Sequence, residues 1–194
     1  MDDLEKLLKQ AVWVARSLFE RNKVVGSAAN LSFIGNGKLY ITASGTCFGN
    51  LTENDFSIID SDGNVVNGKK PSKELPLHQI LYKRDSKIKA VIHTHSFYSV
   101  LWSMEKHNNN HDCVPDYTPY LKMKIGTIGL VPYEQPGSKA LFDAFASVVN
   151  ASDGYILKNH GPLVGGKDIM DAFYCLEELE ESCKVAWHVK HYLC

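Results

Sequence analysis

Hydrophobic residues recur every three or four positions along several segments of the chain, which is the pattern of an amphipathic helix. Residues 4–19 show this pattern directly after Asp2 and Asp3, two acidic residues suited to a helix start. Residues 168–191 form the longest such segment, and its charged side is typical of a solvated surface. Shorter helices are expected at 73–84, 97–105 and 138–149. Two long amphipathic helices therefore enclose the rest of the sequence.

The middle of the chain contains short β-type runs separated by turn residues. Residues 31–44 form two such runs around Gly-Asn-Gly, and residues 56–66 repeat the plan around Asp62-Gly63, so both are predicted hairpins. Further strands are expected at 88–93, 126–133 and 155–158. Strands and helices alternate irregularly, without repeats or linkers. This order favours an α/β fold in which a mostly antiparallel sheet is flanked by helices.

Composition and charge exclude several classes of protein. A length of 194 residues with 44% hydrophobic and 22% charged residues predicts one folded domain, residues 1–194. The 21 basic and 22 acidic residues are spread along the chain, so we expect no nucleic-acid partner. The sequence shows no leader and no apolar run of membrane-spanning length, which predicts a cytoplasmic protein without a membrane partner. The cysteines are odd in number, contain no CxxC pair, and are expected to be reduced thiols: Cys47, Cys113, Cys175, Cys183 and Cys194.

Three histidines stand where a metal site could form. His93 and His95 lie at the end of a predicted strand, and a separation of two residues puts both rings on one face, about 6.6 Å apart at Cα. An HxH pair alone is more often two ordinary histidines. His160 changes this balance, because it follows a short strand and precedes a glycine, at a position where a third ligand can converge. Three histidines and an open position are typical of catalytic zinc. The other histidines have no partners visible in the sequence and are left out: His78, His107, His111, His188 and His191.

A metal with an open position also needs a proton-transfer group and a place for its substrate. Glu74 is the best candidate for proton transfer, although a glutamate at a helix start is normally a surface residue. Small polar side chains beside glycine can bind an anion. Such side chains occur in three segments, each ordinary when taken alone: Asn30 and Ser32; Ser44, Gly45 and Thr46; Lys70 and Ser72. None of these segments matches a nucleotide-binding fingerprint.

Taken in order, ANLS, TASGT, KPSKELPLH, VIHTHS and KNHG resemble the signature of the class II aldolase/adducin family across nearly the whole chain. The resemblance implies a three-layer α-β-α fold with a central, mostly antiparallel sheet. It implies one Zn²⁺ per subunit, or another divalent metal, on His93, His95 and His160, with Glu74 facing or ligating the metal and acting as acid and base. It also implies a substrate phosphate held by Asn30, Ser44, Gly45 and Ser72.

The resemblance further implies a homotetramer with active sites at subunit interfaces. The family's catalytic tyrosine, supplied to a neighbouring subunit, is expected at Tyr120, with Tyr117 as the alternative. Two departures affect detail. Ala29 replaces the usual glycine before the NLS, so the phosphate loop is expected to differ slightly, and a tail that covers the site is expected to be short or absent, since the chain ends soon after the last helix.

Within the family, the stretches GTCFGNL, DYTPYLKMKIGTIGLVPYEQPG and NHGPLVGGKDIMDAFYCLEELEES are most similar to 3-oxo-tetronate 4-phosphate decarboxylases. The implied activity is decarboxylation of that small phosphorylated sugar acid to dihydroxyacetone phosphate through a metal-bound ene-diolate. An aldolase that cleaves L-fuculose 1-phosphate or a similar ketose phosphate is the alternative. The related epimerases carry aspartate in place of Glu74, which disfavours that activity. A non-catalytic, adducin-like binding module is the alternative of another class, and adducin head domains lack the metal histidines.

Overall fold

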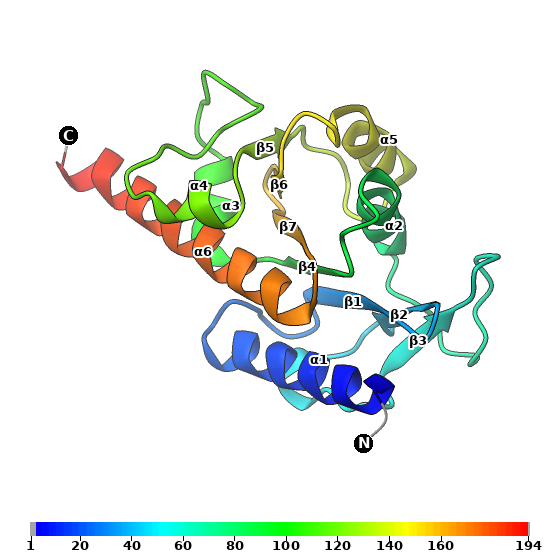
Figure 1. Cartoon of the computed structure of the whole chain (residues 1–194). Coiled ribbons are helices and arrows are strands. Elements are labelled where there is room, and N and C mark those ends of the chain that lie inside the picture. The colour runs from blue at the N-terminus through cyan, green and yellow to red at the C-terminus, as the bar shows by residue number, and fades with distance from the viewer. Residues whose placement is uncertain (1–2, 194) are drawn as a thin grey trace.

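A computed structural model describes residues 3–193; Asp2 of the expected helix start and Cys194 lie outside them. The chain folds into helices and strands that alternate irregularly (Figure 1). In chain order they are α1 (Asp3–Glu20), β1 (Ala29–Gly35), β2 (Lys38–Thr42), the 3-10 helix η1 (Phe48–Asn50), β3 (Phe56–Ile59), α2 (Leu75–Arg84), β4 (Ala90–Thr94), α3 (Phe97–Ser103), α4 (Tyr120–Lys124), β5 (Ile128–Val131), α5 (Lys139–Val148), β6 (Gly154–Leu157), β7 (Gly161–Gly166), α6 (Ile169–His188) and the π-helical η2 (Val189–Leu193).

The strands form one sheet in the order β3-β2-β1-β4-β7-β6-β5. Every neighbouring pair is antiparallel except β5 and β6, which are parallel. The prediction of a mostly antiparallel sheet is therefore confirmed. The central position of β4, between β1 and β7, places the end of that strand in the middle of the sheet.

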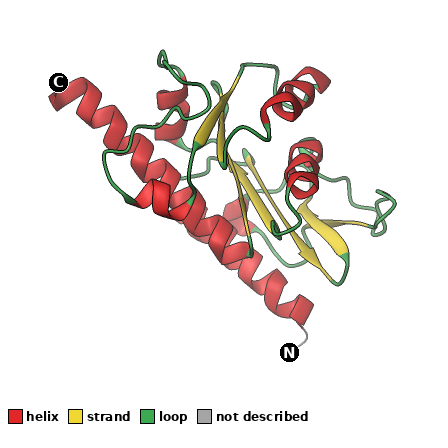
Figure 2. Ribbon diagram, turned by 45° about the horizontal axis from the view of Figure 1, so that its top comes forward, coloured by secondary structure: helices red, strands yellow, loops and turns green. Residues whose placement is uncertain are grey.

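Helices cover both faces of the sheet, which confirms the three-layer arrangement (Figures 1 and 2). One face packs against α1 and α6 through a large apolar cluster that includes Leu18, Phe33, Ile92 and Leu176. The opposite face packs against α2 and α5, and its cluster includes Leu77, Val91, Phe145 and Leu163. Val91 and Ile92 are neighbours in β4 that serve opposite clusters, as the alternation of side chains along a strand requires.

Strand β7 and the short helices η1 and α4 were not predicted, and one hairpin is incomplete. Strand β7 has the sequence GPLVGG. Its three glycines and its proline are poor strand formers, yet pairing with β4 on one side and β6 on the other holds it in the sheet. Helix α4 has only five residues. The predicted hairpin at 56–66 keeps its first strand as β3, whereas the return segment makes a single bridge between Val65 and Ile59.

Among residues 3–193, no helix combines the length and the apolar character that a membrane span requires.

Candidate metal centre

The sheet brings the three histidines together from the end of β4 and from the turn between β6 and β7. His93 lies in β4, His95 follows the end of that strand, and His160 immediately precedes β7, which pairs with β4. The start of β7 approaches β4 very closely, because a Cβ atom on Gly161 would lie 2.0 Å from the carbonyl oxygen of Thr94. Gly161 also has a φ of +146°, a conformation that L side chains rarely adopt. The glycine of KNHG is therefore what allows His160 to reach the other two rings.

The three imidazoles enclose a space of the size that a metal ion needs. Their ring centroids lie 4.6–5.2 Å apart, and one ligand nitrogen from each ring lies within 4.8 Å of the others. The Nε2 atoms of His93 and His160 are 3.2 Å apart. Two nitrogens bound to one tetrahedral zinc ion at about 2.0–2.1 Å lie roughly 3.3 Å apart. The cluster therefore fits a divalent metal, and its three nitrogens suit zinc.

The ring orientation of His93 leaves the correct nitrogen free for a metal. Its Nδ1 lies 2.8 Å from the carbonyl oxygen of Pro162 in β7, and a carbonyl only accepts, so Nδ1 carries the proton and Nε2 carries the lone pair. Burial lowers the pKa of His93 to about 3 and that of His95 to about 4. Both rings are therefore neutral near pH 7, which is the form that binds metals.

Glu74 precedes α2 and is buried, although a glutamate at a helix start is usually exposed. Its Oε2 lies 3.4 Å from Nε2 of His93, and its Oε1 lies 3.3 Å from Nε2 of His160. Oε1 has no hydrogen-bond partner among the described residues. Burial raises the pKa of Glu74, but the two histidines and Asn30 lower it by more, so its pKa lies below the ordinary value. A buried, ionised carboxylate with an unpartnered oxygen beside three imidazoles is a further sign of a cation site.

A cavity of about 290 Å³ opens beside this cluster. Its size is near the lower end for ligand pockets, which suits a small substrate. Most of the predicted site residues line it, namely Asn30, Ser44, Gly45, Ser72, Glu74, His95 and His160, while His93 lies fully buried behind them. Ala29 is also part of the wall. Lys73 lines the cavity too, and sequence reasoning missed it, although its position beside Glu74 was a usable signal.

Other predicted residues lie elsewhere. Tyr120 is 61% exposed and lines a separate groove between α4 and α6, so it does not reach the cavity of its own chain. The alternative, Tyr117, is half exposed. Ser32, suggested for the anion, is fully buried, and its hydroxyl contacts His78 and Tyr82. His78 does not line the cavity, but it lies one helical turn after Glu74 and has polar partners in Asn30 and Ser32 that the sequence did not reveal.

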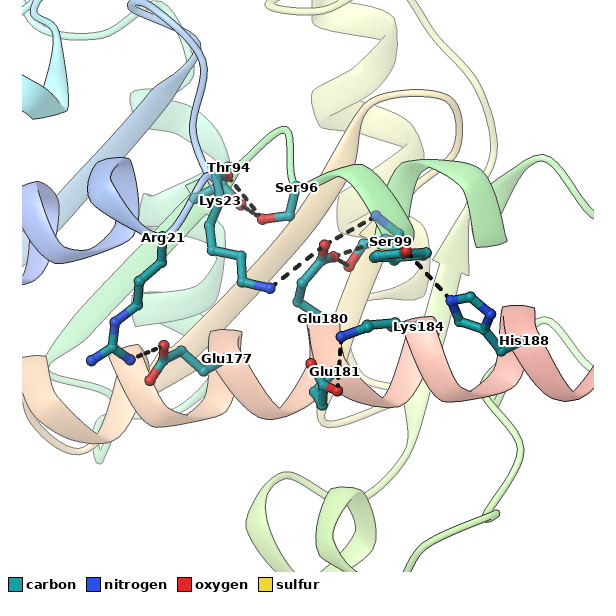
Figure 3. A network of polar contacts seen from close by, with 11 residues as sticks. Arg21, Lys23, Thr94, Ser96, Ser99, Glu177, Glu180, Glu181, Lys184 and His188 are labelled. Atoms are coloured by element: carbon teal, nitrogen blue, oxygen red, sulfur yellow. Dashed lines mark hydrogen bonds and ion pairs between the residues drawn. The ribbon is translucent and has the colours of Figure 1, made fainter.

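A second polar network fixes the turn that carries His95 (Figure 3). The hydroxyls of Thr94 and Ser96, on either side of His95, lie 2.6 Å apart, and Ser96 donates to the carbonyl oxygen of Lys23. Next along the chain, the N-terminus of α3 is tied to α6. The buried carboxylate of Glu180 accepts hydrogen bonds from the backbone nitrogen and hydroxyl of Ser99, and it lies between Ser99 and Lys23 in Figure 3. These contacts connect the segment just after His95 to the long last helix, α6.

Comparisons with known proteins identify the family of the chain. Residues 9–187 match the family described as Class II Aldolase and Adducin N-terminal domain. The chain is 36% identical over 182 residues to the 3-oxo-tetronate 4-phosphate decarboxylase of Escherichia coli K12, covering 93% of this chain and 86% of that protein. It is 38% identical over 177 residues to the L-fuculose phosphate aldolase of Methanocaldococcus jannaschii, covering 91% and 93%.

Among solved structures, YgbL of Escherichia coli superposes with a TM-score of 0.91 at 34% identity, covering 98% of this chain and 93% of that one. An L-fuculose 1-phosphate aldolase superposes with a TM-score of 0.85 at 26% identity, covering 96% and 87%. The family match spans the strands and turns that carry all three histidines and Glu74. The chain belongs to the class II aldolase and adducin N-terminal domain family.

Proposed function

We propose that this protein is a zinc-dependent lyase that decarboxylates 3-oxo-tetronate 4-phosphate to dihydroxyacetone phosphate and CO₂. The observation that carries the proposal is the cluster of His93, His95 and His160 beside a buried, ionised Glu74, at the wall of a small polar cavity. The relatives named as decarboxylases of this substrate, at 34–36% identity, support the choice of reaction.

In the proposed site the three histidines hold one zinc ion, and Glu74 faces it as a further ligand or as the proton carrier. When bound, the ion supplies Lewis acidity that stabilises negative charge developing on the oxygens of the substrate. His93 and His160 can bind through Nε2, as their 3.2 Å separation allows. His95, His160 and Glu74 line the cavity, so a metal held by this cluster would be accessible to a substrate bound there.

Decarboxylation breaks the bond between C1 and C2, and its electron pair passes to C2 and the C3 carbonyl, giving an ene-diolate. CO₂ leaves, and C2 needs one proton to become the CH₂OH group of dihydroxyacetone phosphate. Since its pKa lies below the ordinary value, Glu74 rests as a carboxylate. It can therefore accept the proton of the substrate's C2 hydroxyl on binding and return a proton to C2 after CO₂ has left. Solvent then restores the hydroxyl proton, so one proton is consumed in each turnover.

The phosphate is proposed to lie against Asn30, Ser44, Gly45 and Ser72, which share the cavity wall with the metal cluster. Among the described residues that line this cavity, Lys73 is the only lysine or arginine. Its ammonium lies 3.3 Å from the carbonyl oxygen of Pro136, also in the wall. A substrate with both a phosphate and a carboxylate suits a site that combines this cation with a divalent metal.

Aldol cleavage of L-fuculose 1-phosphate or a similar ketose phosphate is the second candidate. It passes through the same ene-diolate of dihydroxyacetone phosphate, so one arrangement of residues serves both reactions. The 38% identity to an L-fuculose phosphate aldolase is the observation that favours it.

We also propose that the enzyme works in the cytoplasm as a homotetramer in which Tyr120 serves a neighbouring subunit's site. Tyr120 and Met123 are 61% and 79% exposed beside each other on α4, and Tyr120 is absent from its own cavity. Elution volume with light scattering tests the assembly. A stable monomer at micromolar concentration would leave Tyr120 without a role, whereas a tetramer disrupted by Met123→Asp with loss of turnover would support it.

The experiment that tests the proposed reaction measures CO₂ release from 3-oxo-tetronate 4-phosphate and aldehyde release from L-fuculose 1-phosphate on the same zinc-loaded sample. We expect CO₂ release with the larger kcat/KM. Aldehyde release with the larger value selects the aldolase. If the protein binds no divalent metal and acts on neither substrate, the adducin-like binding module is the better reading.

A further inference from the structure

A chain of buried hydrogen bonds runs from Glu74 away from the cavity into the core. Nδ2 of Asn30 lies 2.9 Å from Oε2 of Glu74, and Nε2 of His78 lies 2.5 Å from Oδ1 of Asn30. Nδ1 of His78 lies 2.7 Å from the hydroxyl oxygen of Ser32, which lies 2.7 Å from the hydroxyl of Tyr82. His78 and Ser32 are fully buried, and Asn30 and Glu74 nearly so.

The fold explains why these groups meet. Asn30 pairs with His93 across β1 and β4, so its side chain lies beside a metal histidine on the face of the sheet that α2 covers. Ser32 is two residues further along β1 and shares that face. Glu74 lies just before α2, and His78 and Tyr82 follow at steps of four residues along one side of the helix. The chain of contacts is therefore the seam between β1 and α2.

Starting from Glu74, each group in this chain determines whether the next one donates or accepts a hydrogen bond. The carboxylate of Glu74 only accepts, so Asn30 presents its NH₂ group to Glu74 and its oxygen to His78. The Asn30 oxygen also only accepts, so Nε2 of His78 must carry the proton. Nδ1 of His78 then accepts from the Ser32 hydroxyl, and the Ser32 oxygen accepts from Tyr82. Every hydrogen bond points in one direction, toward Glu74.

We propose that His78 is a positioning residue that sets the orientation of the Asn30 side-chain amide and thereby makes the wall of the cavity a hydrogen-bond donor. Asn30 lines the cavity, and one hydrogen of its NH₂ group goes to Glu74. The second hydrogen of that group is available to an anion in the cavity. Turned by 180°, the amide would direct its oxygen at the Glu74 carboxylate and at the anion, which are both negative. His78 opposes that turn, because its N–H would then face an NH₂ group.

The surroundings keep His78 in the neutral form that this role needs. Burial lowers the pKa of His78 to about 4, although the negative charge of Glu74 acts in the opposite direction. A charged His78 would carry protons on both ring nitrogens and lose the hydrogen bond from Ser32. The polar groups in this seam are buried between α2 and β1, where an unpartnered donor or acceptor is destabilising. The orientation is therefore set by the protein before any substrate binds.

A matched pair of substitutions tests the role of His78. Glutamine places an NH₂ group near the position of Nε2 and can still donate to Asn30, whereas asparagine is one carbon shorter and cannot reach it. For zinc-loaded His78→Asn we expect inorganic phosphate to bind at least about 10-fold more weakly and kcat to fall about 10- to 100-fold, the range for residues that orient metal-site groups. For His78→Gln we expect both values within about threefold of the wild type. His111→Asn, the same substitution at an exposed histidine outside the cavity, serves as the control.

Two measurements do not depend on turnover. ¹⁵N NMR of the wild type should show His78 protonated at Nε2 and unprotonated at Nδ1. Calorimetry measures the affinity for inorganic phosphate, which depends on the donor that Asn30 presents to the cavity. The inference rests on the proposed function for the effect on kcat and for the phosphate contact of Asn30, whereas the tautomer of His78 depends on neither. If His78 is protonated at Nδ1, or if the glutamine and asparagine variants lose phosphate binding equally, the positioning role is refuted. If tautomer and phosphate binding are as expected but neither substrate is turned over, the proposed function fails and the positioning role stands.

Discussion

Gly161 is the residue on which the metal cluster most directly depends, and Gly161→Ala is expected to disrupt it. An added Cβ would lie 2.0 Å from the Thr94 carbonyl oxygen, and real Cβ atoms essentially never approach other heavy atoms within 3.0 Å. The start of β7 must therefore move by at least about 1.0 Å, while metal–ligand distances tolerate only about 0.2 Å. The φ of +146° adds a backbone cost on the order of 1–3 kcal/mol for alanine.

Two assays separate the loss of the site from the loss of the fold. Competition with a chelator should show zinc affinity reduced by more than about 100-fold, beyond the 10- to 100-fold typical of residues that only orient ligands. Urea unfolding should show a stability lower by a few kcal/mol, a loss that a domain with about 5–15 kcal/mol survives. Gly165→Ala is the control in the same strand, since its Cβ would meet the side chain of Ile88 at 3.0–3.3 Å, whereas that of Gly161 would meet backbone at 2.0 Å. Wild-type zinc affinity in folded Gly161→Ala would refute the argument that this close approach positions His160.

Three further predictions follow from the same contacts. Glu74→Gln should keep bound zinc, because the three histidines remain, and lose at least about 100-fold in kcat; metal analysis and the CO₂ assay check this, and retained turnover would contradict the proton-transfer role. Glu180→Ala removes the acceptor of two backbone N–H groups and one hydroxyl at the start of α3. The free energy of unfolding measured in urea should fall by about 2–4 kcal/mol. Glu180→Gln keeps one acceptor oxygen, so its loss of stability should be smaller. The pKa of His78 is about 4 in the folded protein and about 6.5 in the unfolded chain. Between these two pH values only the unfolded chain carries a proton on His78, so the free energy of unfolding falls as the pH drops from about 6.5 to 4. His78→Gln should reduce that dependence, measured as the free energy of unfolding against pH, by up to about 1.4 kcal/mol per pH unit, and an unchanged slope would show that His78 titrates normally.

Much of the fold could be predicted because the signals are local. The 3.6-residue period of the apolar positions gives α1 and α6, and Gly-Asn-Gly gives the turn between β1 and β2. The period of two along a strand also puts His93 and His95 on one face. Strand β7 could not be predicted, because its glycines are required by close contacts with Thr94, Ile88 and Ala172 that belong to other elements.

The sequence by itself determined most helices and strands, the residue types for a metal cluster and their order in the family signature. Only the tertiary structure decided which polar groups share one buried space. Glu74 looks like a surface residue in its own helix and becomes a buried carboxylate because β4 and the turn before β7 face it. His78 looks like an isolated histidine and gains its partners from β1. Tyr120 looks like a site residue and lies in another groove. The physical reason is that periodicity reports which face a residue occupies, whereas burial, charge and hydrogen bonding depend on what packs against that face.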